Sequence, residues 1–234
     1  MFFRLLNPYF FLSLLKKARP FLLFASVIFL IAGIYSSLFA SPEDYQQGEM
    51  VRMMYIHVPS AWLSLMIFMV MGLSSASCLI WKARFGFYIS LASAEIGSYF
   101  ALITLLTGMI WGKPIWGAWW VWDARLTSML ILFIFYILYI GISKGSDNIH
   151  KIEKPCCVIA LLGMINVPIV KFSVDLWYSL HQPASIFKVS GPSVDFSMLK
   201  PLIIMFIANL LLFVILLSLK IEILLNKNNV LRRN

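Results

Sequence analysis

The sequence predicts an all-α integral membrane protein, a six-transmembrane-helix bundle with both termini in the cytoplasm. The first observation is composition: 61% of the 234 residues are hydrophobic and 12% are charged, whereas soluble domains carry about 25% charged residues. The second is a series of apolar segments near the length of about 20 residues that spans a bilayer as a helix. The third is the alternation of Lys and Arg between successive connections.

Six windows are long and apolar enough to span: 21–40, 59–80, 88–110, 126–142, 156–172 and 201–219. The fourth and fifth are short, and we expect them to extend into their flanks. The alternating strands of about ten residues that a membrane barrel requires do not compete with these windows. We therefore expect residues 1–234 to form a single membrane domain, with the first window retained as a helix rather than removed as a signal peptide.

The N-terminus, the second and fourth connections and the C-terminus hold 13 of the 19 Lys and Arg residues. Basic residues near span ends prefer the cytoplasmic side. Segments 41–58, 111–125 and 173–200 should therefore meet on the opposite, outer face. Anionic lipid headgroups at the cytoplasmic surface then account for the net charge of +9, and we expect membrane lipid but no nucleic acid as a partner.

Two of the three histidines fall on the predicted outer face, His57 in MYIHVPSAW and His181 in SLHQPAS. Each precedes a proline by two residues, and we expect Pro59 in the first turn of the second helix and Pro183 in a turn. Either histidine could be an interfacial polar side chain without a ligand. Two imidazoles also suit the axial positions of a haem iron, and they suit them better than a tetrahedral zinc site, which needs four ligands.

The three cysteines lie away from the outer loops. Cys78 is inside the second window, and Cys156 and Cys157 are at the start of the fifth. We therefore expect no disulfide between the outer loops, and the C-x-x-C-H motif of covalent haem attachment does not occur in the sequence. A haem held by the two histidines would be of b type, non-covalent and transient.

The stretch WGKPIWGAWWVWDAR, residues 111–125, holds five of the eight tryptophans. An aromatic belt at the membrane interface is one explanation, although a belt is usually spread over many helix ends. A flat apolar platform for a planar ligand such as a porphyrin is the other. Three residues disfavour a regular helix in the first half: Gly112, Pro114 and Gly117. If the second half is helical, four side chains share one face: Trp116, Trp119, Trp120 and Asp123.

The polar residues allow two roles each. Asp123 is a favoured N-cap at the start of the fourth helix and could also orient a ligand. Glu95, inside a predicted span, is either functional or hydrogen-bonded to a neighbouring helix. Four basic residues of the outer face could each meet a haem propionate or a lipid phosphate: Arg52, Lys113, Arg125 and Lys188.

The stretch WGKPIWGAWWVWDARLTS resembles the WWD motif of haem-handling membrane proteins. Together with MYIHVPSAW and SVDLWYSLHQPAS it is similar to the CcmC family, the haem exporter protein C family of cytochrome c maturation. The similarity extends over the whole six-span layout. It implies a multi-pass protein of the bacterial inner membrane, or of a mitochondrial inner membrane that retains the pathway, which binds haem on the outer, periplasmic face.

The resemblance also implies the roles of individual residues. The axial iron ligands would be His57 and His181. The WWD loop, residues 111–125, would lie against the porphyrin through Trp111, Trp116, Gly117, Trp119, Trp120, Trp122, Asp123 and Arg125.

The partners that the resemblance implies are a membrane-anchored periplasmic haem chaperone, ABC-transporter subunits and a small single-span subunit. The sequence contains no nucleotide-binding P-loop. A partner would therefore hydrolyse ATP, and the chain would be a haem-binding and transfer factor rather than an enzyme. Two other functions stay open: a b-type bis-histidine electron-transfer cytochrome, and a haem-free permease subunit.

Overall fold

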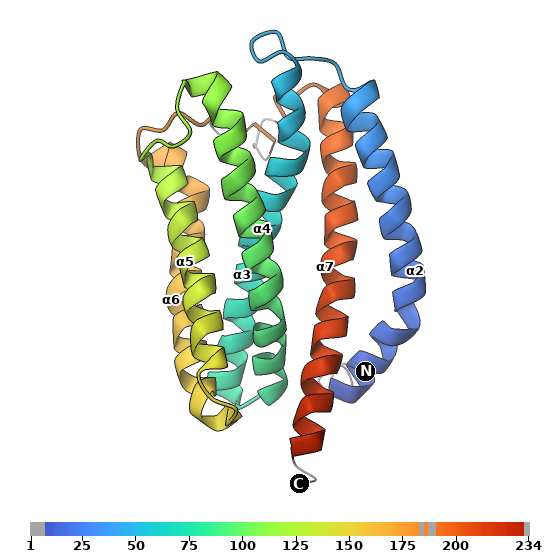
Figure 1. Cartoon of the computed structure of the whole chain (residues 1–234), viewed down its shortest axis with the longest axis vertical. Helices are drawn as coiled ribbons and strands as arrows, with labels where there is room; N and C mark the ends of the chain where they lie inside the picture. Colours follow the sequence, from blue (N-terminus) through green and yellow to red (C-terminus); the bar gives the residue numbers. More distant parts are fainter. Residues whose placement is uncertain (1–7, 183–184, 187–190, 232–234) are drawn as a thin grey trace.

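The computed structural model describes residues 8–182, 185–186 and 191–231. Within these residues six long helices run side by side (Figure 1): α2 (Pro8–Tyr35), α3 (Met54–Trp81), α4 (Arg84–Trp116), α5 (Ala124–Lys144), α6 (Ile149–Leu176) and α7 (Phe196–Leu231). Each is long and apolar enough to cross a membrane, and no strand occurs in the described part of the chain. The predicted all-α, six-span bundle is confirmed.

The helices are longer than the apolar windows from which they were predicted. The π-helix η1 (Ser36–Ala40) continues α2, so the first window, 21–40, covers the second half of α2 and all of η1. The 3₁₀-helix η2 (Glu49–Met53) runs directly into α3. The chain is therefore already helical at Met54, and Pro59 lies beyond the first turn in which we expected it.

The three connections with the unusual residues share one end of the bundle (Figure 1). This end, which we call the tryptophan end, holds the α2–α3, α4–α5 and α6–α7 connections. The start of α2 and the end of α7 lie at the opposite end, which we call the terminal end. The helices α3 and α4 pack against each other at the centre, α5 and α6 flank them on one side, and α2 packs on α7 at the other edge.

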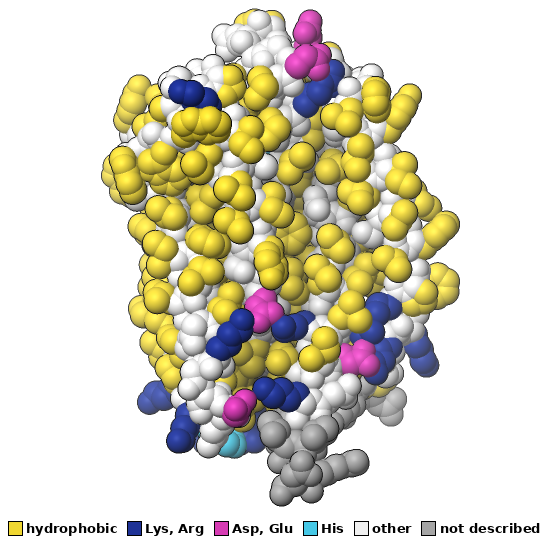
Figure 2. All heavy atoms as spheres, in the orientation of Figure 1, with side chains coloured by type: hydrophobic (Ala, Val, Ile, Leu, Met, Phe, Trp, Pro, Cys, Tyr) yellow, Lys and Arg dark blue, Asp and Glu magenta, His cyan; other side chains and the backbone are white. Residues whose placement is uncertain are grey.

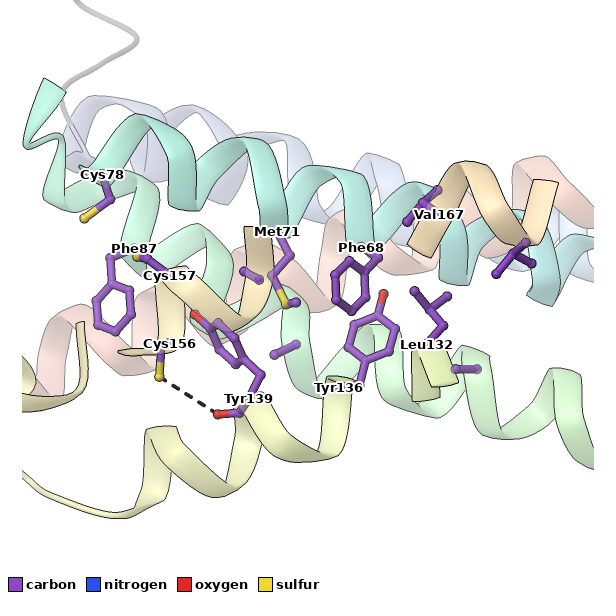
Figure 3. Close-up of a cluster of buried hydrophobic side chains, with 14 of the residues drawn as sticks. Phe68, Met71, Cys78, Phe87, Leu132, Tyr136, Tyr139, Cys156, Cys157 and Val167 are labelled. Atoms are coloured by element: carbon purple, nitrogen blue, oxygen red, sulfur yellow. Dashed lines mark hydrogen bonds between the residues drawn. The ribbon is translucent and has the colours of Figure 1, made fainter. Parts of the chain in front are cut away.

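The core between α3, α4, α5 and α6 combines apolar side chains with a few satisfied hydroxyl groups (Figure 3). The Tyr136 hydroxyl donates to the Ser64 carbonyl at 2.7 Å, and the hydroxyls of Tyr139 and Ser90 are hydrogen-bonded at 2.7 Å. Phe68 packs edge-on against Tyr136 in the same cluster. Each buried phenol therefore has a partner, which removes the desolvation cost of an unpaired polar group.

The cysteines lie in or beside this core as buried free thiols, Cys78 from α3 and Cys156 and Cys157 from α6 (Figure 3). The expectation that no disulfide links the outer loops is confirmed for these three residues.

A small residue sets the closest approach of α4 to α5. A Cβ atom added at Gly97 would collide with the ring and hydroxyl of Tyr136. Since Tyr136 is fully buried and hydrogen-bonded, its rigid ring has no space into which to move.

We predict that Gly97→Ala lowers the free energy of unfolding by about 1 to 3 kcal/mol, because the added methyl overpacks this helix contact. The measurement is thermal unfolding of the detergent-solubilised protein. Gly141→Ala is the matched control, since no atom lies within 4 Å of a Cβ at that position; it should leave the melting temperature unchanged or raise it. Equal melting temperatures for Gly97→Ala and the wild type would contradict this packing argument.

Candidate functional site

His57 lies in the first turn of α3 and packs against the end of α4. Its Nδ1 is 3.1 Å from Thr107 Oγ1, and its ring meets the Trp111 ring edge-on, with centroids 5.6 Å apart. The indole N–H of Trp111 donates to Gln47 Oε1 at 2.9 Å. A Cβ at Gly108 would lie 3.1 Å from His57 Cε1, so the missing side chain at Gly108 makes room for the imidazole.

The hydrogen bonds of Thr107 fix which nitrogen of His57 carries the proton. The Thr107 hydroxyl donates to the Ile103 carbonyl at 2.6 Å, so its oxygen is the acceptor in the contact with His57. Nδ1 of His57 is then the protonated nitrogen of a neutral ring, and Nε2 carries the lone pair.

His181 follows α6 and is held by Asp123. Its Nδ1 is 3.2 Å from Asp123 Oδ2, and its side chain is 19% exposed. The same carboxylate oxygen accepts from the Ser179 hydroxyl at 2.6 Å and from the Leu180 N–H at 3.3 Å. The ring meets Trp116 edge-on, with centroids 4.9 Å apart. A carboxylate can only accept, so Nδ1 of His181 donates, and in the neutral form of the ring Nε2 carries the lone pair.

Asp123 also caps the helix that follows it. Its Oδ1 accepts from the Leu126 N–H at 2.7 Å, which confirms the expected N-cap of α5. Burial alone would raise the pKa of this carboxyl, but the hydrogen bonds from His181, Ser179 and Leu126 outweigh burial and hold its pKa well below the ordinary value. Asp123 is therefore ionised at neutral pH and joins the WWD loop to the segment that carries His181.

The WWD stretch is helical in its first half, where we expected no regular helix, and irregular in its second half. The helix α4 continues to Trp116, and the residues between Gly117 and Asp123 form no helix. Pro114 lies in the last turn of α4, and the Trp116 ring lies over Gly112, 2.8 Å from where a Cβ would be. Gly117, at φ +77°, donates its N–H to the Lys113 carbonyl and ends the helix.

This geometry divides the five tryptophans into two groups. Trp111 and Trp116 belong to α4, and each contacts one histidine. The other three belong to the irregular segment, where Trp119 is 55% and Trp122 75% exposed. Trp120 lies edge-on against Trp122, with centroids 5.5 Å apart, and its buried indole N–H has no hydrogen-bond partner among the described residues. The condition for a shared helix face of Trp116, Trp119, Trp120 and Asp123, a helical second half, is therefore not met.

The basic residues that could meet a ligand carboxylate differ in the partners that their side chains already have. The Arg52 guanidinium pairs with Glu49 and donates to the carbonyls of Ser37 and Ser41, so it holds the α2–α3 connection together. Lys113 donates to the Gly117 carbonyl at 2.9 Å. Lys188 lies outside the described residues.

Arg125 lies in the first turn of α5, two residues after Asp123, and its guanidinium bonds Ser173 Oγ at 3.3 Å and the Lys171 carbonyl at 3.4 Å. These are long contacts to neutral acceptors. Among the three described candidates, only Arg125 lies within two residues of Asp123, and its hydrogen-bond acceptors are neutral.

Glu95 is not part of this cluster. Its carboxylate pairs with Lys220 and lies 3.7 Å from Lys144 Nζ, and both lysines belong to the terminal end.

Sequence reasoning missed three polar residues of the site: Gln47, Thr107 and Ser179. Thr107 and Trp111 are four residues apart, so both face His57 once α4 is extended beyond the apolar window. This spacing was visible in the sequence. Gln47 and Ser179 lie in irregular segments, where spacing does not reveal contacts.

Comparison with known proteins identifies the family of this chain. The sequence model of the family described as CcmC, Heme exporter protein C, matches residues 1–234. The chain belongs to this family. The resemblance seen in the tryptophan and histidine stretches is thereby confirmed.

Individual members of the Heme exporter protein C family are similar over most of their length. Heme exporter protein C of Bradyrhizobium diazoefficiens is 45% identical over 229 residues, which cover 98% of this chain and 85% of the relative. The protein of the same name from Escherichia coli K12 is 38% identical over 183 residues, 78% of this chain and 74% of the relative. The putative cytochrome c biosynthesis ccmC-like mitochondrial protein of Marchantia polymorpha is 42% identical over 206 residues, 88% and 87% of the two chains.

We predict that Asp123→Asn lowers the free energy of unfolding by about 2 kcal/mol at neutral pH, the usual value of hydrogen bonds to a charged group. Asn still caps a helix, so the loss reports mainly the contacts to His181 and Ser179. Because the folded-state pKa is below the ordinary 3.8, the stabilisation is complete above about pH 4 and is lost as pH falls below it.

Thermal unfolding in detergent at about pH 7 and about pH 3 checks this prediction, and the difference from the wild type should shrink at the lower pH. The control is Asp147→Asn, at an exposed side chain, which should change stability little at either pH. A deficit of equal size at both pH values would show that Asp123 acts through something other than its charge.

Proposed function

We propose that the chain binds haem non-covalently at the tryptophan end and passes it to another protein during cytochrome c biogenesis. The names of its relatives, Heme exporter protein C and a ccmC-like mitochondrial protein of cytochrome c biosynthesis, support haem as the cargo. The axial ligands are His57 and His181, and the tryptophan-rich segment lies against the porphyrin.

The tautomers of the two imidazole rings are the main support for this proposal. Each ring donates through Nδ1 to an acceptor of the protein, Thr107 for His57 and Asp123 for His181. Such second partners orient a metal-binding histidine and raise its basicity. In their neutral forms both rings therefore keep an Nε2 lone pair for iron. Two interfacial histidines without a ligand would not need matching tautomers.

The tryptophans fit a planar, partly polar ligand. Trp119 and Trp122 present exposed aromatic surface, which a porphyrin can cover by stacking. The buried indole N–H of Trp120 lacks a partner, and a ligand carboxylate would satisfy it. Arg125, two residues from Asp123, is our first candidate for meeting a propionate, and Lys188 is a second.

The arrangement favours a carrier over a permanent cytochrome. His57 lies at the start of a helix and His181 after the end of one, so both ligands are near the membrane surface rather than deep within the bundle. The three thiols are buried elsewhere and free, and no covalent link holds the cargo. Haem bound here keeps one edge accessible to an incoming protein.

The wider role places the tryptophan end in the periplasm and both termini in the cytoplasm of a bacterial inner membrane. The receiving protein is a membrane-anchored periplasmic haem chaperone. Subunits of an ABC transporter, acting with a small single-span subunit, hydrolyse ATP to release the loaded chaperone.

We expect the purified protein to show the absorption spectrum of six-coordinate haem, and this haem to be extracted by acid acetone. The His57→Ala/His181→Ala double variant should lose that spectrum, because both Nε2 ligands are gone. His150→Ala is the matched control, since His150 lies at the start of α6 at the terminal end. Haem-free wild-type protein that also fails to bind added haem would favour the permease-subunit function, and haem that resists transfer to the chaperone would favour a permanent cytochrome.

We expect Trp120→Phe to weaken haem binding about tenfold, because it removes one hydrogen bond to a charged group while keeping an aromatic ring. Its thermal stability should not fall, since the N–H that it removes is buried and unpartnered. Trp81→Phe, at an exposed side chain at the end of α3, is the control for the loss of an indole. Haem titration followed by absorbance measures both, and wild-type affinity in Trp120→Phe would rule out this hydrogen bond.

A further inference from the structure

A groove lies between α5 and α7 on the face of the bundle that Figure 2 presents, with α4 as its floor. Toward the terminal end it encloses about 400 Å³. A second hollow of about 300 Å³ continues it toward the tryptophan end, and the two share Glu95, Ile140 and Lys144. The groove is separate from the histidine cluster and has no part in the function proposed above.

Charged side chains gather in the terminal half of the groove. The lysines are Lys144, Lys220 and Lys227, and the carboxylates are Glu95 and Asp147. Lys220 pairs with Glu95, Lys144 Nζ lies 3.7 Å from the same carboxylate, and Lys227 Nζ lies 3.3 Å from Asp147. Glu95 therefore brings two ammonium groups together, each with N–H groups left to donate. The five side chains sum to one positive charge.

The other half of the groove is mainly apolar. Beyond Glu95 and Lys144 it is lined by Leu102 of α4 and by Phe133 and Ile137 of α5, with Ser98 and Tyr99 beside them. Figure 2 shows the same change along this face, from charged side chains near the terminal end to a hydrophobic band above. Phe133 and Lys144 are separated by about 16 Å at 1.5 Å per helical residue, close to half of a hydrocarbon core of about 30 Å.

We propose that this groove binds one anionic phospholipid. Its phosphodiester lies against Lys144 and Lys220, and an acyl chain runs along α4 toward Phe133. A single phosphodiester balances the one excess positive charge, whereas a zwitterionic lipid leaves that charge unbalanced. The apolar length matches one leaflet, which a free phosphate would leave uncovered.

The first test is native mass spectrometry of the full-length protein, purified in detergent and equilibrated with equal amounts of phosphatidylglycerol and phosphatidylcholine. The wild type should retain one phosphatidylglycerol at least about fivefold more often than phosphatidylcholine, and Lys144→Gln/Lys220→Gln should lose this preference. Lys151→Gln, at an exposed lysine of the same end, should keep it. Equal retention of the two lipids by the wild type, or the same loss in the control, would overturn the proposal.

Further variants separate lipid binding from a purely structural ion pair. Lys227→Gln changes a largely exposed side chain, so it should fold even if the double variant does not, and it should lower the preference about twofold to fivefold. Glu95→Gln raises the net charge of the groove by one, so phosphatidylglycerol retention should stay or increase. Reduced retention in Glu95→Gln with a folded protein would mean that the ion pair is structural.

A photo-crosslinker identifies the occupant in native membranes. Ile137→p-benzoylphenylalanine places the probe in the apolar half of the groove. A mass increase of one phospholipid supports the proposal, and a protein-sized adduct overturns it. Haem titration of the same variants should give wild-type affinity, so a failure of the lipid site is distinguishable from a failure of haem binding.

Discussion

The carboxylate of Asp123 is the contact on which the arrangement of the tryptophan end depends. One of its oxygens caps α5, and the other accepts from His181, Ser179 and the Leu180 backbone. Two segments far apart in the chain are thereby fixed at one point: the end of the WWD loop, which leads directly into α5, and the segment after α6. Because the carboxylate is buried and every hydrogen bond to it is charge-assisted, the cluster is strong and its geometry is specific.

The sequence predicts the frame of the protein well, because each long apolar run needs a helix in lipid and nothing else satisfies its backbone. The N-cap role of Asp123 was also predictable, since capping is a local interaction. The helical first half of the WWD stretch was not. Pro114 and Gly112 lower helix propensity, but a ring that packs on Gly112 and a left-handed Gly117 override that preference through contacts of the folded chain.

In the candidate site, too, local features could be predicted from the sequence and contacts between distant residues could not. The chemistry of His57 and His181 and their common end of the bundle followed from residue type and span count. Their tautomers depend on Thr107 and Asp123, which lie 50 and 58 residues away in the chain. Contacts at that separation are set by how α3, α4 and α6 pack, and a single sequence carries no direct signal for them.

The two histidines are held in place by different kinds of contact, and this difference affects the order in which the proposed ligands would dissociate from haem. His57 belongs to α3, where the backbone hydrogen bonds of the helix fix its position, and its ring contacts Thr107 of α4. His181 belongs to an irregular segment that side-chain contacts tie to the bundle. A haem bound between them, as proposed above, would have one rigidly held ligand, His57, and one ligand in an irregular segment, His181. Under the proposed function, haem would therefore dissociate from His181 first and stay on His57 of α3 while the receiving protein binds the side that His181 has left.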